Sequence, residues 1–139
     1  MIAFTVFDGR DGRICFCGSA SDMVQARLQI RSGYQDVILF AAASGETHYA
    51  PGGEITPRPS IDLPAVSVPL GSASVPVSPP LPAGTLVERA LDGSGYQAPV
   101  ARSQAGEILH MPGALGVTHY LVTPPWPLRP ATLTVTVTE

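Results

Sequence analysis

Proline and glycine interrupt this 139-residue sequence throughout, and they restrict its fold more than any other feature. The chain contains 15 prolines and 14 glycines, together roughly twice their ordinary share. Proline breaks helices and glycine weakens them, whereas both residues suit turns. The sequence therefore predicts an all-β fold in which many short strands are joined by turns.

Two hairpins are predicted in the first part of the chain. The β-prone runs Phe4–Phe7 and Ile14–Cys17 flank two Asp-Gly pairs, and glycine there supplies the positive φ of a tight turn. A second hairpin is expected where Thr47–Ala50 and Glu54–Thr56 flank a Pro-Gly-Gly turn. Both hairpins belong to a predicted N-terminal module.

The segment between these hairpins carries one helix signal and one strand signal. Ser21 and Asp22 are good N-cap residues and indicate a short helix or turn that ends by Gly33. The apolar run Val37–Phe40 is typical of a buried strand.

A proline-rich stretch divides the chain. Eight of the prolines lie between Pro57 and Pro82, and proline cannot donate the N–H that a central strand needs. We therefore expect an N-terminal β-hairpin module at 1–59 and a linker with short strands at 60–82. A second domain follows at 83–139, or alternatively begins at residue 60.

The last part of the chain has the spacing of strands and turns that is typical of a small β-sandwich. Leu133, Val135 and Val137 alternate with threonines, which predicts a strand with one buried and one solvated face. Further strands are indicated at 85–90, 107–110 and 116–122, with turn signals about every ten residues. These patterns predict a small Ig-like antiparallel β-sandwich.

The charge pattern excludes several classes of function. The net charge is −3, lysine is absent, and the eight arginines are scattered, so no basic patch suits nucleic acid. No apolar run approaches the length of about 20 residues that crosses a bilayer, and the first residues do not resemble a signal peptide. We expect synthesis in a cytoplasm, no nucleic-acid partner and no membrane insertion. The absence of lysine and asparagine points to a GC-rich genome.

The residue types that carry chemistry form no convincing site. Cys15 and Cys17 lack a second pair for structural zinc and are expected to pack as small apolar side chains. His48, His110 and His119 have no metal-ligand spacing. We therefore predict a non-enzymatic protein with no catalytic residue, no metal and no cofactor.

Three side chains are candidate contact anchors: Trp126, Arg129 and Tyr120. Trp126 is the only tryptophan and lies between prolines. Rigid aromatic and arginine side chains supply much of the binding energy at interfaces. A second interpretation, in which Trp126 is a lid packed over the end of the sandwich, stays open.

Several motifs resemble small tail proteins of long-tailed bacteriophages. A Thr-His-Tyr strand leads into a Gly-Gly turn, a Glu-Ile pair and Arg58-Pro59, which resembles the short N-terminal module of such proteins. Further motifs resemble the second module that often follows in such proteins. They are Leu81–Thr85, Met111–Gly113, Tyr120–Val122, Trp126–Arg129 and the alternating terminal strand.

The resemblance implies a virion protein of a tail tip, baseplate or fibre attachment, close to host recognition. Its partners would be other tail proteins and further copies in a homo-oligomer or symmetric assembly. Alternatives are a carbohydrate- or receptor-binding module, a capsid-decorating protein, an assembly chaperone and, last, a small hydrolase. A glycan or host receptor would need exposed aromatics, for which the four tyrosines and Trp126 are candidates.

Overall fold

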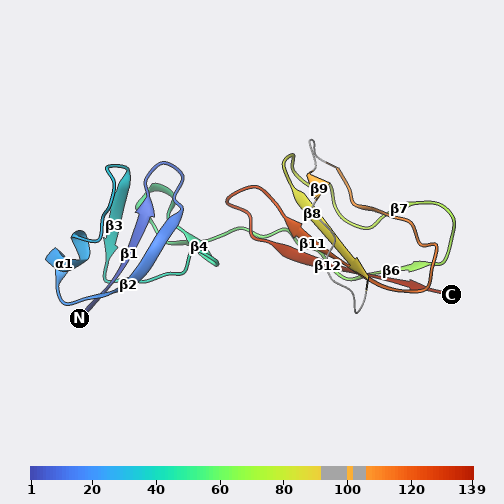
Figure 1. The fold of residues 1–139 in the computed structure, drawn as a ribbon, viewed down its shortest axis with the longest axis horizontal. Coiled ribbons are helices and arrows are strands. Elements are labelled where there is room, and N and C mark those ends of the chain that lie inside the picture. The colour runs from blue at the N-terminus through green and yellow to red at the C-terminus, as the bar shows by residue number, and fades with distance from the viewer. Residues whose placement is uncertain (92–99, 102–105) are drawn as a thin grey trace. The chain divides into compact units, whose positions relative to one another are not determined.

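The computed structural model describes residues 1–91, 100–101 and 106–139. The chain forms two compact units, Met1–Pro59 and Ser60–Glu139. Both are built mainly from strands (Figure 1), which confirms the predicted all-β fold. We call them the N-terminal and C-terminal units and describe each by itself.

A three-stranded antiparallel sheet forms the centre of the N-terminal unit. Its order is β2 (Ile14–Ala20), β1 (Ile2–Asp8), β3 (Gln35–Leu39). The first predicted hairpin is therefore present as β1 and β2. A β-bulge interrupts it, because Val6 pairs with Phe16 and the next residue, Phe7, pairs with Ile14.

One face of this sheet is covered by the short helix α1 (Met23–Arg27). The Asp22 carboxylate accepts a hydrogen bond from the Gln25 N–H at 2.9 Å, as the N-cap signal predicted. Ala26 is fully buried against Phe4 and Val6. A helix of one and a half turns thus closes this face through a single small side chain.

The other face is covered by the loop that follows β3, and Thr5 fixes it there. Thr5 is fully buried. Its hydroxyl donates to the Ala41 carbonyl at 2.9 Å and accepts from the Ala43 N–H at 3.1 Å. The loop continues into β4 (His48–Tyr49) and β5 (Thr56–Pro57), the second predicted hairpin.

Strand β3 is less buried than its sequence predicted. Val37 to Leu39 are half-buried, and Phe40 is 68% exposed with a φ of 67°. The strand lies at the edge of the sheet, so only one of its sides faces a neighbouring strand. A run of apolar residues cannot distinguish an edge strand from a central one.

The C-terminal unit contains a five-stranded sheet and a two-stranded sheet. Their orders are β6-β12-β11-β8-β9 and β10-β7. The strands are β6 (Val66–Pro69), β7 (Val75–Pro76), β8 (Leu86–Leu91), β9 (Val100–Ala101), β10 (Leu109–His110), β11 (Gly116–Thr123) and β12 (Ala131–Thr138).

One pairing departs from the predicted antiparallel pattern. Strand β6 runs parallel to β12, with Val66 beside Val135 and Val68 beside Val137. The antiparallel expectation came from strands joined by short turns, whereas β6 and β12 are far apart in the chain. The segment 60–82, for which two assignments were open, lies with the C-terminal unit.

The core of the C-terminal unit lies on one face of the larger sheet. Leu133 and Val135 of β12 are fully buried, as their alternation with threonine predicted. Val122 of β11 is also fully buried. The remaining buried members of the cluster come from β6, β11, β12 and the segments around β7 and β10: Val68, Val77, Leu81, Ile108, Tyr120 and Val137.

Candidate contact surfaces

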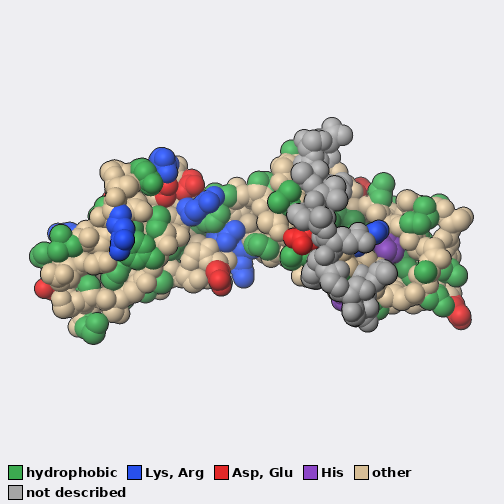
Figure 2. Space-filling view, in the orientation of Figure 1, with side chains coloured by type: hydrophobic (Ala, Val, Ile, Leu, Met, Phe, Trp, Pro, Cys, Tyr) green, Lys and Arg blue, Asp and Glu red, His purple; other side chains and the backbone are tan. Residues whose placement is uncertain are grey.

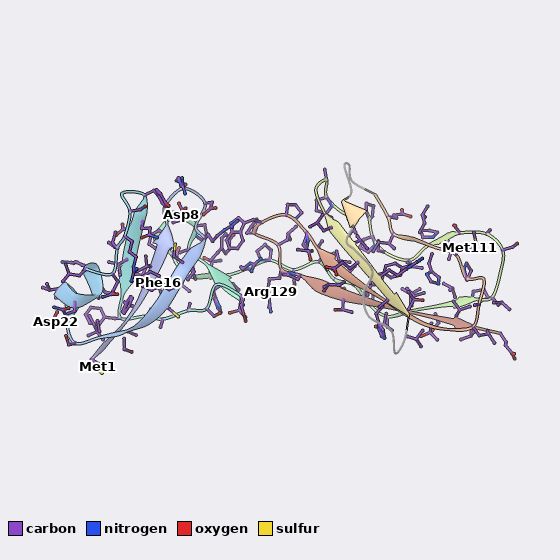
Figure 3. All side chains as sticks on the ribbon, viewed as in Figure 1. Met1, Asp8, Phe16, Asp22, Met111 and Arg129 are labelled. Atoms are coloured by element: carbon purple, nitrogen blue, oxygen red, sulfur yellow. The ribbon has the colours of Figure 1, made fainter. Side chains whose placement is uncertain are left out.

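Three large apolar side chains are exposed at one end of the C-terminal unit. Leu70 is 50% exposed, Met111 56% and Leu115 52%. Leu70 comes from the loop after β6, and Met111 and Leu115 come from the loop between β10 and β11. Figure 2 shows several separate apolar spots at this end, where Figure 3 labels Met111. We call these three residues the apolar tip.

The strand register brings these loops to the same end of the sheet. Leu70 follows the end of β6, where Pro69 pairs with Thr138. Leu115 precedes β11, whose first residue pairs with Val137. The Gly71 N–H donates to the Pro112 carbonyl at 2.9 Å, which joins the Leu70 loop to the Met111 loop. The apolar tip is therefore one region assembled from distant parts of the sequence.

The N-terminal unit also exposes apolar side chains at one end. Met23, Val24 and Leu28 in and after α1 are 46%, 64% and 65% exposed. Phe40 lies at the same end, because its N–H donates to the Ala3 carbonyl at 2.7 Å near the start of β1. We call Met23, Val24, Leu28 and Phe40 the apolar end. Exposed apolar side chains at one end of a unit are candidates for an interaction site.

The three contact anchors that the sequence suggested have different surroundings. Tyr120 is only 5% exposed and belongs to the core, so we do not retain it as an anchor. Trp126 is half-buried, so it is neither fully exposed nor a fully buried lid. Arg129 is exposed, and its backbone pairs with Ser60.

Tyr120 instead forms a buried polar pair with His110. The His110 Nδ1 lies 2.7 Å from the Tyr120 hydroxyl, and the two rings meet edge to face. Burial, with a smaller effect from the charge of Arg89, lowers the pKa of His110, and burial raises the pKa of Tyr120. Both side chains are therefore neutral at pH 7 and link β10 to β11. Ile108 and His110 are buried and Leu109 is exposed, an alternation that the sequence Ile-Leu-His does not show.

The other two histidines lie apart from this pair. His119 Nδ1 is 3.2 Å from the Thr134 hydroxyl, and His48 Nδ1 is 2.7 Å from the Thr47 hydroxyl in the other unit. Among residues 1–91, 100–101 and 106–139, no three His, Cys, Asp or Glu side chains are grouped as metal ligands.

Cys15 and Cys17 are free and exposed, so the expectation that they pack as small apolar side chains is wrong. The β-bulge also breaks the alternation that would put them on one face. Cys15 Sγ lies 3.4 Å from the Gln35 amide nitrogen, on the face that carries Val37. Cys17 pairs with Thr5 on the opposite face. The two thiols therefore do not form a two-ligand site.

A polar cluster not anticipated from the sequence occupies the first hairpin. Arg10 Nη2 lies 2.7 Å from Asp8 Oδ2, and the guanidinium stacks 3.7 Å from the centroid of the Tyr34 ring. Hydrogen bonds from Arg10 lower the pKa of Asp8. Tyr34 is 47% exposed, whereas the other described candidates for a glycan platform are half-buried or buried. Tyr96 lies outside the described residues.

A shallow groove of about 370 Å³ lies beside β7. Its walls are mostly apolar and include Pro64, Pro76, Pro79 and Pro80, with Glu107 at its margin. Proline has little rotational freedom, so these walls are rigid.

Comparison of the chain with family models, curated proteins and solved structures gave no match. Within the part of the chain that the structure describes, no helix has the length and apolar character needed to cross a membrane.

Proposed function

We propose that this chain is a non-enzymatic structural protein of a bacteriophage tail or phage-like particle, at a tail tip, baseplate or fibre attachment. The apolar tip is the observation that carries the proposal. Leu70, Met111 and Leu115 are 50%, 56% and 52% exposed and lie at one end of the unit. Other exposed leucines of the described unit, Leu86 and Leu109, lie in strands β8 and β10. Such side chains gain free energy when a partner covers them.

The tail assignment itself draws on the sequence. The Thr-His-Tyr strand, its Gly-Gly turn and Arg58-Pro59 resemble the N-terminal module of small tail proteins. A chain with two compact units also suits an assembly, since each unit can meet a different neighbour. Symmetric repetition then multiplies weak contacts.

Fractionation of particles tests this proposal. Lysate from the producing host is separated on a density gradient, and the protein is followed by immunoblotting and immunogold electron microscopy. We expect the protein in intact particles with gold at the tail. Gold on the head would instead favour a capsid-decorating protein, and absence from mature particles would favour an assembly chaperone; either result overturns the tail assignment.

Substitution of the apolar tip tests the contact mechanism. Leu70→Ser and Met111→Ser remove exposed apolar surface while leaving the core intact, so we expect folded protein that no longer enters particles. Leu86→Ser is the matched control, because Leu86 is 39% exposed outside the tip. Normal incorporation of both tip variants would contradict a contact role for this surface.

Glycan binding is a second candidate, favoured by the exposed Tyr34 ring beside Arg10 and Asp8. Aromatic rings bind the apolar faces of sugars, while charged neighbours bind hydroxyls. Because Arg10 covers one face of the ring, a sugar would stack on the other. Loss of the protein's adsorption to host cells in the Tyr34→Ala variant, with normal adsorption of the Tyr49→Ala variant, would support this function. Equal adsorption of both variants would contradict it.

A further inference from the structure

The outer edge of β2 differs from the opposite edge of the same sheet. Strand β2 has β1 on one side and no described strand on the other. Its sequence, Ile14–Ala20, contains no charged residue and no proline. Open strand edges normally carry charges, proline or a covering segment, because exposed backbone donors and acceptors pair readily with another strand.

The opposite edge, β3, is protected. The Asp36 carboxylate accepts a hydrogen bond from the Val37 N–H at 2.7 Å. This N–H points away from β1, because alternate residues of an antiparallel strand point to opposite neighbours and Phe40 is the residue that donates to Ala3. A charged side chain therefore occupies one of the few free donors of β3. No comparable protection is seen along the second half of β2 in the described chain.

The same alternation identifies the free backbone groups of β2. Since Ala3 accepts from the β3 side, Phe4 and Val6 direct their backbone groups toward β2, where they pair with Gly18 and Phe16. The N–H and C=O groups of Cys17 and Ser19 consequently point outward. The beginning of β2 is covered, because a Cβ on Gly45 would lie 3.0 Å from the Ile14 carbonyl oxygen. The open part of the edge is Cys17–Ala20.

We propose that this edge pairs with the same edge of a second copy of the chain, in antiparallel orientation about a twofold axis. With Gly18 on the axis, Cys17 of each copy lies opposite Ser19 of the other, and the two residues exchange backbone hydrogen bonds. Because the edge is uncharged, a second copy places no like charges across the seam. The pairing would form a continuous six-stranded sheet.

Neighbouring apolar surface favours a copy of the same chain as the partner. In this register Phe16, which is half-buried, lies opposite Ala20 of the other copy. Helix α1 begins three residues beyond Ala20 and exposes Met23 and Val24. Apolar contact therefore adds to the backbone hydrogen bonds, which matters because edge pairing alone buries little area. The inference names one partner for the proposed structural role and does not depend on the particle being a phage tail.

Self-association of the full-length chain provides the test. Analytical ultracentrifugation over a wide concentration range is expected to show a monomer–dimer equilibrium. Ser19→Pro removes an outward donor, and Cys17→Lys places like charges across the seam, so each should weaken dimerisation by about tenfold or more. Ala83→Lys adds the same charge at an exposed turn of the other unit and should leave dimerisation unchanged. Circular dichroism and thermal melting establish that each variant is folded.

Hydrogen exchange locates the interface directly. The Cys17 and Ser19 amides should exchange quickly in dilute protein and slow down as the dimer forms. A chain that stays monomeric throughout overturns the inference, as does a dimer insensitive to Cys17→Lys with no change at these amides. A dimer lost instead in the Leu70→Ser variant would assign self-association to the apolar tip and also overturn it. Particle incorporation is measured separately, so the two proposals can fail independently.

Discussion

The two units reach the same all-β architecture by different means. In the C-terminal unit, one face of a five-stranded sheet buries a cluster of large aliphatic side chains, with Leu133, Val135 and Val122 fully buried. In the N-terminal unit, the small sheet is covered by Ala26 on one face and by the Thr5-bound loop on the other. The C-terminal unit is specified mainly by the volume of its buried apolar side chains, and the N-terminal unit mainly by close backbone contacts and hydrogen bonds. The two should therefore respond to different substitutions.

Leu133→Ala is expected to have the largest effect. It leaves a cavity in the C-terminal core and should lower the free energy of unfolding of that unit by about 4 kcal/mol. Trp126, the only tryptophan, reports unfolding of this unit by fluorescence. Hydrogen exchange in β1–β3 should be unchanged. Equal loss of protection from hydrogen exchange in both units would show that they unfold together and would contradict the difference between them.

Gly12→Ala is expected to destabilise only the N-terminal unit, by about 3 kcal/mol. Gly12 has a φ of 77°, and a Cβ would lie 2.8 Å from the Ala50 carbonyl carbon and the Pro51 nitrogen. Hydrogen exchange of the β1 amides should accelerate, whereas the thermal unfolding transition followed by Trp126 fluorescence should stay unchanged. Gly52→Ala is the control, because its φ is also positive but its Cβ meets nothing within 4 Å. Equal effects of the two variants would contradict a role for the close approach.

Thr5→Val tests the buried hydroxyl with little change of shape. The Ala41 carbonyl and the Ala43 N–H lose their partner, so we expect a cost of about 2 kcal/mol. The backbone amides of the loop after β3 should be the first to show faster hydrogen exchange. Thr56→Val, at a partly exposed position, serves as the control. An unchanged free energy of unfolding in the Thr5→Val variant would mean that apolar packing, and not hydrogen bonding, holds this loop.

Tyr120→Phe removes the polar contacts of the Tyr120 hydroxyl in the apolar unit. It removes the hydroxyl that lies 2.7 Å from His110 Nδ1, and the unpaired ring nitrogen should cost about 1 kcal/mol. The measurement is denaturant unfolding followed by Trp126 fluorescence. A cost as large as that of Leu133→Ala would place the polar pair among the principal stabilising contacts of this unit.

The pH dependence of the same pair should be the smallest effect. Because burial lowers the pKa of His110, the folded state binds a proton less readily than the unfolded state. The contribution of His110 is therefore fully present above its unfolded pKa of about 6.5 and is lost as the pH falls below it. His110→Gln should flatten this dependence. An identical pH profile for His110→Gln and wild type would exclude His110 as the cause.

Local patterns predicted much of the fold. Asp-Gly pairs indicated the β1–β2 hairpin, Asp22 indicated α1, and the Leu-Thr-Val-Thr alternation indicated β12. These features depend on neighbouring residues, which is where sequence patterns are informative. The register of β11 with β12 pairs Tyr120 with Leu133, and this pairing, which the β11 sequence alone does not specify, puts Tyr120 on the buried face.

Features that depend on distant residues were not predictable in this way. The parallel pairing of β6 with β12 joins Val66 to Val135, and no turn connects the two strands. The bulge that separates Cys15 from Cys17 depends on the fit of β2 to β1. The apolar tip comes from two loops, after β6 and between β10 and β11, that meet only when the sheet forms. Candidate contact surfaces were therefore harder to predict than the strands that carry them.

The place of β12 between β6 and β11 also dictates an order of events during synthesis. Val135 leaves the ribosome 69 residues after its partner Val66, so β6 must wait, unpaired, while most of its unit is translated. The β1–β2 hairpin needs only a short turn and can close at once. During translation the early module is therefore expected to be structured while the later one still exposes apolar strands, a period in which chaperones have the greatest opportunity to act.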